Sequence, residues 1–304
     1  MADPQWARFL QEYFEVPAPE FKDVYVLGSF AGKVTLYSQQ VRALNLIFAL
    51  HESGKLLKNA EIAIIGAGAG GITAAAGAAF CGAKVTVFDE LEGPLELQRN
   101  NRQRWIHPHI YDWPHFHLSA VEATGGDEAR LPLLSWSAGY AANVASEIIR
   151  QWEFIESAYP IDTHWSVDKA EIRKHKGALQ VRWLGRDTSS REQSFSHVIL
   201  AVGFGLEPER SCSDSYWAED DIDGSFKKRN VPLSWLISGC GDGALTDLMR
   251  IYIHRFRQDE MMNLFAGARS IQALRADFLY ELPKAKNPRD FFDALSIDSE
   301  LRDI

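Results

Sequence analysis

The sequence has little cysteine and no surplus of basic residues. Its 304 residues include three cysteines, Cys81, Cys212 and Cys240, which lie far apart along the chain. So few cysteines in a chain of this size exclude a disulfide framework and indicate a reducing compartment. The 41 acidic residues outnumber the 32 basic ones, which gives a formal net charge of −9. Nucleic acid is therefore not expected as a partner, because a phosphate backbone needs a positive protein face.

Long apolar runs are also missing. No stretch approaches the roughly 18 consecutive apolar residues of a membrane-spanning helix, so no membrane partner is expected. The first residues, Met1-Ala2-Asp3-Pro4, lack the charged and apolar regions of a signal peptide, and we therefore expect a cytoplasmic location. The remaining composition, 46% hydrophobic and 24% charged, is ordinary for an α/β protein with a large core.

The most informative feature that is present is a glycine turn after a short apolar stretch. Residues 62–65 form this stretch, and Gly66, Gly68 and Gly71 follow it with the spacing G-x-G-x-x-G. In dinucleotide-binding folds the first glycine permits a tight turn, the second lets the backbone approach a pyrophosphate, and the third lets a helix pack closely on the strand. The phosphates would bind the free N–H groups at the start of that helix, near Gly70.

A second apolar stretch, residues 85–88, ends in Asp89, at the distance from the turn where such folds place a ribose-binding acid. A carboxylate there accepts hydrogen bonds from a ribose 2′-hydroxyl and repels a 2′-phosphate. The strand, the helix and the acid agree with one another. The sequence therefore predicts a site for FAD or NAD rather than for NADP.

Two later segments resemble motifs of a known flavoprotein group. Residues 196–205 are similar to the "ATG" segment of flavoproteins with two dinucleotide-binding domains, the glutathione reductase-like and amine oxidase-like group. Residues 236–244 resemble that group's second FAD motif, a strand that ends in Gly-Asp and opens a helix. The resemblance implies bound FAD, with NAD as the alternative, and places Asp242 at its ribityl or pyrophosphate part. The expected cofactor-binding residues are Gly66, Gly68, Gly70, Gly71, Asp89, Gly203, Gly241 and Asp242.

The chain departs from that group in three respects. It has no second G-x-G-x-x-G motif for a pyridine nucleotide, and its separated cysteines cannot form the redox-active pair of the disulfide reductases. Glu92-Gly93-Pro94 stands where amine oxidase-like members carry Gly-Gly-Arg. Disulfide reduction is therefore not expected, and the resemblance does not identify a substrate.

The apolar pattern predicts an α/β fold with a Rossmann-type parallel sheet, an inserted β-meander and a small helical C-terminal region. Beyond the glycine turn, the strand-like stretches are residues 161–167, 170–173, 178–184 and 195–202. Helices are predicted at residues 38–52, 137–155 and 244–258, the first of them capped by Ser38. The resemblance implies a three-stranded meander before the ATG-like segment.

The first sixty residues carry elements of their own. Residues 24–27 and 33–37 look like two short strands, and the helix that follows them would sit beside the glycine turn. Gln39, Gln40 and Arg42 near the start of this helix are candidates for cofactor or partner contact, or are surface polar residues. The predicted division is a strand-helix extension at 1–58, an FAD/NAD(P)-binding domain at 59–258 and a helical tail at 259–304.

A dense group of imidazole, guanidinium and indole side chains follows the ribose acid, at residues 99–117. It is interpreted either as an aromatic and cationic wall around a flavin and an anionic substrate, or as a structural loop. The candidate catalytic residues in it are Arg104, His107, His109 and Tyr111, with Asp112 as a further candidate for proton transfer. No metal is expected, because no carboxylate or cysteine cluster accompanies the histidines at ligand spacing.

These features favour an FAD-dependent oxidoreductase that acts on an unidentified small molecule. The alternative is a non-catalytic subunit that holds NAD or FAD and acts as a sensor or scaffold in a larger complex. Neither residues 206–235 nor the tail after residue 258 looks large enough for a substrate domain. We therefore also expect a partner surface, supplied by a second copy of the chain or by a companion subunit.

Overall fold

The computed structural model describes residues 6, 10, 13, 21–28, 34–109, 126–175, 177–185, 189–203, 216–223, 234–237, 242–253 and 255–257. The chain divides into two compact units, Met1–His109 with Gly125–Asp220, and Ile110–Thr124 with Asp221–Ile304. The first unit contains the glycine turn, and the second contains helix α7, Asp242–Tyr252. Among the described residues, no helix is both long and apolar enough to cross a membrane.

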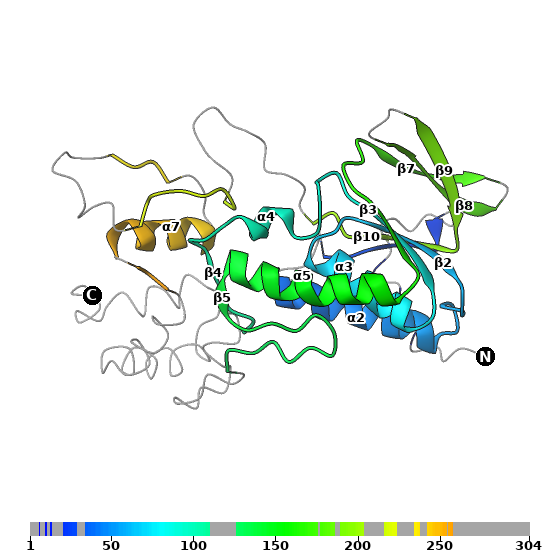
Figure 1. The fold of residues 1–304 in the computed structure, drawn as a ribbon, viewed down its shortest axis with the longest axis horizontal. Coiled ribbons are helices and arrows are strands. Elements are labelled where there is room, and N and C mark those ends of the chain that lie inside the picture. The colour runs from blue at the N-terminus through cyan, green and yellow to red at the C-terminus, as the bar shows by residue number, and fades with distance from the viewer. Residues whose placement is uncertain are drawn as a thin grey trace, which may run out of the picture. The chain divides into compact units, whose positions relative to one another are not determined.

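A five-stranded parallel sheet forms the centre of the first unit (Figure 1). Its strands are β1 (Val24–Val26), β2 (Glu61–Ile65), β3 (Lys84–Phe88), β6 (Ile161–His164) and β10 (His197–Leu200). They lie in the order β1-β10-β2-β3-β6, and each neighbouring pair is parallel. The predicted α/β class with a Rossmann-type parallel sheet is confirmed.

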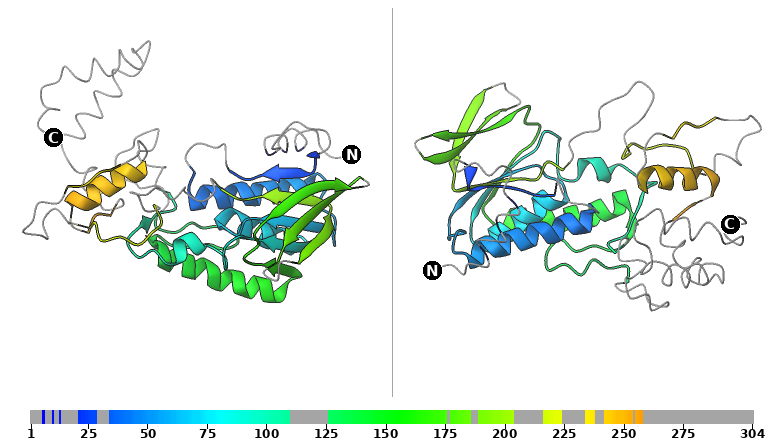
Figure 2. Two further views of the ribbon diagram at one scale, coloured as in Figure 1. Left: turned by 90° about the horizontal axis from the view of Figure 1, so that it is seen from above. Right: turned by 180° about the vertical axis from the view of Figure 1, so that it is seen from behind.

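Three helices cover one face of this sheet (Figure 2). They are α2 (Leu36–Glu52), α3 (Ala69–Phe80) and α5 (Ala141–Ala158). The crossovers from β1 to β2, from β2 to β3 and from β3 to β6 run in one direction across the sheet, and right-handed crossovers in one direction place their helices on one face. Every residue from Ala69 to Ala79 is buried, because α3, a helix of small side chains, packs closely against both the sheet and α2.

An antiparallel meander covers the opposite face of the sheet. It consists of β7 (Ala170–His175), β8 (Ala178–Leu184) and β9 (Ser190–Phe195) in sequence order. Its inward residues share one apolar cluster with the second face of the parallel sheet: Leu179, Val181, Trp183 and Phe195 pack with Val24, Ala63, Phe88 and Val198. The first unit therefore has three layers, with the parallel sheet in the middle.

The meander differs from the prediction in its strands. Residues 161–164, predicted as strand, form β6 at the edge of the parallel sheet and take no part in the meander. The third meander strand is instead β9, which the sequence pattern did not indicate. Only Phe195 in β9 is buried, and so the strand lacks the apolar alternation on which the prediction depended.

The predicted strand at residues 33–37 is wrong. Leu36 is already the first residue of α2, and Thr35 is its N-cap, in place of the predicted Ser38. The Thr35 hydroxyl accepts a hydrogen bond from the Ser38 backbone N–H at 3.0 Å, and the Ser38 hydroxyl accepts one from the Thr35 N–H at 2.8 Å. This reciprocal capping box satisfies two backbone donors locally, which outweighs the β-propensity of Val34 and Thr35.

The first elements are part of the central layers. β1 pairs with β10, and α2 packs along α3, where an added Cβ on Gly77 would meet Ile47 at an ordinary 3.5 Å. The predicted boundary at residue 58 therefore runs through the helix and sheet layers of one unit. Between α3 and α5 lie the short helix α4 (Glu96–Arg99) and a two-stranded ribbon, β4 (Trp105–Ile106) with β5 (Gly139–Tyr140).

A buried polar cluster lies at the amino end of the parallel sheet. The His197 ring donates from Nε2 to the backbone oxygen of Lys55 at 3.1 Å, and its Nδ1 lies 3.9 Å from a carboxylate oxygen of Asp23. The Lys55 ammonium donates to the Tyr25 hydroxyl at 3.2 Å. Burial lowers the pKa of His197 and raises the pKa of Tyr25, because it disfavours the charged form of each.

The lowered pKa of His197 predicts an acid-sensitive stability. The unfolded chain binds this proton more readily than the folded chain, so stability that is present above the ordinary histidine range, about 6.5, is lost as the pH falls below it. Each unit of pKa depression corresponds to about 1.4 kcal/mol. Urea unfolding at about pH 7.5 and about pH 5.5 should show a smaller loss in His197→Gln than in the wild type.

His175→Gln is the matched control, since His175 is exposed on β7. It should keep the pH dependence of the wild type. An identical pH dependence of the unfolding free energy in His197→Gln and in the wild type would contradict the prediction.

Candidate cofactor site

The carboxyl ends of the parallel strands meet at one edge of the sheet, where the glycine turn lies. Beyond the strands themselves the ladder continues from Gly66 N to Phe88 O at 2.8 Å, from Ala201 N to Ile65 O at 2.7 Å and from Leu27 N to Leu200 O at 2.8 Å. The chain moves from β2 to β3 on one side, whereas β10 lies on the other side of β2. In open α/β sheets, ligands bind at such a reversal of strand order.

The first and third glycines of the motif are required by packing. Gly66 has a φ of 106°, which disfavours other residues, and a Cβ there would lie 2.4 Å from the backbone oxygen of Ala201. A Cβ on Gly71 would lie 1.8 Å from the backbone oxygen of Gly66. Both positions bring backbone so close to backbone that only glycine fits.

Gly68 is different from its two neighbours in the motif. Its φ of −67° is open to any residue, and a Cβ built on it would meet no atom within 4 Å. Neither its conformation nor its packing in the fold therefore requires glycine. The absence of a side chain leaves an open approach to the backbone at the start of α3, which is what a bound pyrophosphate needs.

The start of α3 also offers unused donors. Gly68 is the N-cap and supplies no side chain to cap the helix, which begins at Ala69. Within the part of the chain that the structure describes, the backbone N–H groups of Ala69, Gly70 and Gly71 have no acceptor. Free N–H groups and the positive end of the helix dipole together favour an anion. The residues present therefore fit the diphosphate of a dinucleotide.

Asp89 holds the turn in place. One carboxylate oxygen accepts a hydrogen bond from the backbone N–H of Ala67 at 2.5 Å, and the other accepts one from Leu91 N–H at 2.7 Å. The Ala67 carbonyl in turn accepts a bond from Leu95 N–H at 3.1 Å. Each carboxylate oxygen keeps a further lone pair, so the predicted contact with a ribose hydroxyl is compatible with these bonds. It stays a prediction.

The glycine geometry predicts that substitutions at two glycines of the same motif have unequal effects on stability. Gly71→Ala should lower the free energy of unfolding by about 3 kcal/mol, because the new methyl group overlaps the Gly66 carbonyl. Gly68→Ala should change it by less than about 1 kcal/mol, since the methyl group enters open space at an N-cap. Chemical denaturation of both variants beside the wild type measures the difference. Equal stability losses would show that the turn is not packed as described.

The other predicted cofactor residues are distributed over both units. Gly70 is buried in the first turn of α3, and Gly203 is exposed after β10 with a φ of 61° and open space beside it. Asp242 is the first residue of α7, so the predicted helix opening is confirmed, whereas residues 236–237 are in neither a helix nor a strand. Gly241 lies outside the described residues, as does Tyr111 among the catalytic candidates.

Arg104 is buried and engaged by the segment at residues 216–220. Its Nε donates to the backbone oxygen of Tyr216 at 2.9 Å, its guanidinium lies 4.0 Å from the centre of the Tyr216 ring, and it forms a 3.4 Å ion pair with Asp220. Only 4% of the residue is exposed. These contacts assign Arg104 a structural role, and its predicted catalytic role stays without a test.

His107 and His109 lie together near the start of α2. The Nδ1 of His107 accepts a bond from the His109 backbone N–H at 3.1 Å, and its Nε2 lies 3.5 Å from Asp127. The His109 ring donates from Nε2 to the backbone oxygen of Glu128 at 3.0 Å, and it packs edge-on against Tyr37 with ring centres 5.0 Å apart. The two histidines therefore share one cluster, and His109 is the less buried of the two; their catalytic role stays a prediction.

A buried polar network behind the turn has no signal in the sequence pattern. Gln40 is fully buried, and its amide donates to the Thr73 hydroxyl at 3.2 Å and to the Leu134 carbonyl at 3.0 Å. The Trp136 indole N–H donates a hydrogen bond to the amide oxygen of Gln40 at 2.7 Å. This network ties α2 and α3 to the loop before β5. Gln40 was considered for cofactor contact, but its polar atoms are used within the protein.

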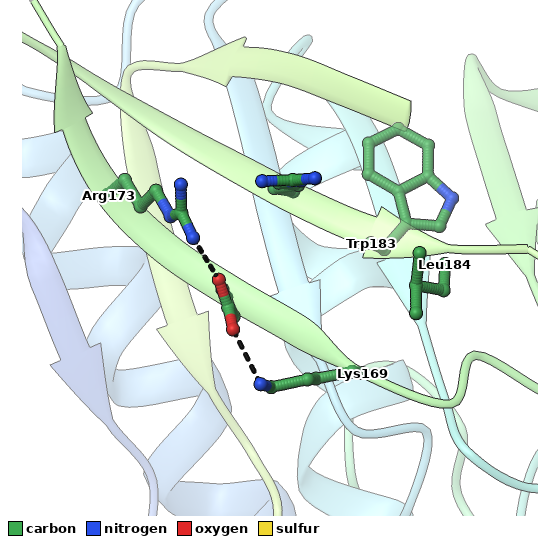
Figure 3. Close-up of a pocket in the computed structure, with 6 residues that line it drawn as sticks. Lys169, Arg173, Trp183 and Leu184 are labelled. Carbon is green, nitrogen blue, oxygen red and sulfur yellow. Dashed lines mark hydrogen bonds and ion pairs between the residues drawn. The ribbon is translucent and has the colours of Figure 1, made fainter. Parts of the chain in front are cut away.

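A shallow pocket lies on the meander (Figure 3). Its lining residues are Lys169, Glu171, Arg173, Arg182, Trp183 and Leu184. Glu171 pairs with Lys169 at 2.7 Å and with Arg173 at 2.5 Å, and hydrogen bonds from these two cations lower its pKa to about 2. Such exposed pairs contribute little energy. We place the candidate cofactor site at the strand ends because the pocket contains none of the motif residues.

Comparisons with known proteins add little to this picture. No protein-family model and no curated protein matches the chain. Thioredoxin reductase from Streptococcus pyogenes is 13% identical with a TM-score of 0.28, over 49% of this chain and 33% of that one. S-allyl-L-cysteine S-oxygenase from Allium sativum is 18% identical with a TM-score of 0.33, over 51% and 38%.

A third solved structure, 2-naphthoyl-CoA reductase in complex with 2-naphthoyl-CoA, is 13% identical with a TM-score of 0.30, over 59% of this chain and 20% of that one. The chain thus spans between 20% and 38% of the lengths of these three proteins. At such TM-scores the similarity carries no argument about function. Within the described residues no group of three or more His, Cys, Asp or Glu side chains is placed to hold a metal ion.

Proposed function

We propose that the chain binds an adenine dinucleotide, FAD, at the carboxyl edge of its parallel sheet and acts as an FAD-dependent oxidoreductase on a small molecule. The observation that carries this proposal is the open approach to Gly68 beside the uncapped start of α3. The packing of the fold does not require glycine at this position. A bound pyrophosphate does require it, because any side chain would stand in its path.

Different residues would bind the diphosphate and the ribose of the dinucleotide. The backbone N–H groups of Ala69, Gly70 and Gly71 would bind the diphosphate, and Asp89 would accept a hydrogen bond from the adenosine ribose while it holds the turn. Bound FAD supplies hydride and electron transfer, and the protein binds and orients it. The role of His109 would be to hold or move a proton at its ring nitrogen.

A non-catalytic role as an NAD- or FAD-holding subunit is the second candidate. It is supported by the position of Asp89 directly after β3, where its carboxylate would accept a hydrogen bond from the ribose 2′-hydroxyl that NAD and FAD share. Residues for the substrate pocket would come, in either case, from a second copy of the chain or from a companion subunit. We also propose a cytoplasmic location, and this proposal rests on composition alone.

The first test is Gly68→Val. A branched side chain at the open position should block the diphosphate, and we expect the affinity for FAD to fall at least about 100-fold, since several charge-assisted hydrogen bonds would be lost. Isothermal titration calorimetry with FAD and with NAD, on refolded protein freed of cofactor, measures the loss. Absorbance of the purified wild type in the flavin region tells which of the two dinucleotides it retains.

Gly177→Ala gives a contrast away from the proposed site. Gly177, between β7 and β8 on the meander, has open space beside it like Gly68, but its φ of 86° makes the substitution one of backbone strain, with no diphosphate to block. It should therefore cost stability and leave the affinity for dinucleotide unchanged. If Gly68→Val folds and retains dinucleotide at the wild-type stoichiometry, the proposed site is wrong.

The second test addresses catalysis. Replacement of His109 by Gln keeps a donor toward Glu128 but removes the ring nitrogens that could accept and release a proton, so flavin reduction should slow by about 10- to 100-fold while cofactor stays bound. Stopped-flow bleaching with excess substrate, with and without a candidate partner protein, is the measurement. His51→Gln, exposed in the last turn of α2, is the control. Unchanged bleaching in His109→Gln would leave the histidine cluster with a structural role only.

A further inference from the structure

We infer that Gln39 contacts the half of the dinucleotide that lies beyond the diphosphate, across the strand reversal from Asp89. This inference rests on the proposed function and assigns a residue to the second half of its site. It places that half along the ends of β1 and β10, in contact with Gln39 of α2 and beside Gly28 and Gly203. Gln39 belongs to α2 and to none of the sequence motifs described above.

The position of Gln39 is defined by two glycines. A Cβ on Gly70, in the first turn of α3, would meet the Cβ of Gln39 at 3.5 Å. At the other end of the same side chain, a Cβ on Gly28 would lie 1.8 Å from its amide oxygen and 2.5 Å from its amide nitrogen. Gln39 therefore reaches from the start of α3 to the end of β1, with its carboxamide flat against the Gly28 backbone.

The carboxamide is polar and incompletely used. Its nitrogen is buried, and no acceptor for it exists in the part of the chain that the structure describes. A buried amide donor without an acceptor costs roughly 1–3 kcal/mol, and so each such group needs an explanation. Gln40, the next residue on the helix, has all its contacts to Thr73, Leu134 and Trp136 within the protein. A ligand group that accepts a hydrogen bond from the Gln39 amide nitrogen would satisfy it, as contacts within the protein satisfy Gln40.

The two helix starts differ in what they can bind. At α2 the capping box of Thr35 and Ser38 satisfies backbone donors, whereas α3 has no side-chain cap. The diphosphate is therefore expected at α3, and a neutral group at Gln39. A carboxamide offers a donor and an acceptor together, which suits sugar or ribityl hydroxyls and the amide edges of a flavin or nicotinamide ring.

The strand order indicates in which direction the dinucleotide would run across the edge of the sheet. A dinucleotide binds across the reversal of strand order, with one half on each side. Asp89 at the end of β3 marks the adenosine side, and the strands on the other side of β2 are β10 and β1. Gly203 lies in the turn after β10 and Gly28 in the turn after β1, and both have a positive φ. Gln39 is packed on the second of these turns, so its carboxamide lies on the side where the second half of the ligand must run.

The experiment separates the two halves of the ligand. Gln39→Met keeps the length of the side chain and removes its amide, and Gln39→Ala tests the same loss with a smaller side chain. Binding of the intact dinucleotide that the wild type retains, FAD or NAD, and of ADP, which carries only the adenosine and the diphosphate, is measured by calorimetry. We expect the dinucleotide affinity to fall about three- to tenfold, as for one lost hydrogen bond, with ADP affinity unchanged.

Asn45→Ala is the control, because Asn45 is exposed on the same helix and should alter neither ligand. Unchanged dinucleotide affinity in both Gln39 variants, or an equal loss for dinucleotide and ADP, overturns the inference and leaves the proposed function standing. A wild-type protein that binds neither ADP nor a dinucleotide overturns the proposed function, and this inference with it. Thermal unfolding of each variant confirms that the binding assays compare folded proteins.

Discussion

The close approach of three backbone segments at the glycine turn is the constraint on which the first unit depends. Gly66 lies against the backbone of Ala201, and Gly71 lies against Gly66, at distances that leave no room for a Cβ. This contact draws α3 onto the sheet, and a helix of alanine and glycine is what fits there. Because α3 is thin, α2 can pack along it, and the two helices begin side by side at the carboxyl edge of the sheet.

The turn is also held from the solvent side. Asp89 accepts a hydrogen bond from the N–H of Ala67, and Leu95 donates one to the carbonyl of the same residue, so that contacts within the protein fix the backbone of Ala67. Leu95 adopts a φ of 53° to do so while it is buried. A site whose backbone is already in place loses less conformational entropy when it binds. The motif acid therefore supports the fold and the site at once.

Local patterns predicted the elements that their own residues determine. β2, α3 and β8 follow from an apolar run, a glycine turn and alternating apolar residues, in that order. The errors have physical causes: the capping box of Thr35 converts expected strand into helix, and β9 has one buried residue to signal it. The pairing of β1 with β10 joins residues more than 170 positions apart. No local pattern contains that information.

The candidate site shows the same limit at the level of single side chains. The local density of charge predicts Arg104 as a site residue, but it does not reveal that the guanidinium is buried against Tyr216 and Asp220, which lie more than 110 positions later in the chain. Gln39 and Gln40 are adjacent and identical in chemistry, yet successive residues on a helix point about 100° apart. The Gln40 amide is therefore hydrogen-bonded to Trp136 and to Thr73 of α3, whereas the Gln39 amide lies against the end of β1. This angle decides which of the two glutamine amides could contact a ligand, and the composition of the segment does not reveal it.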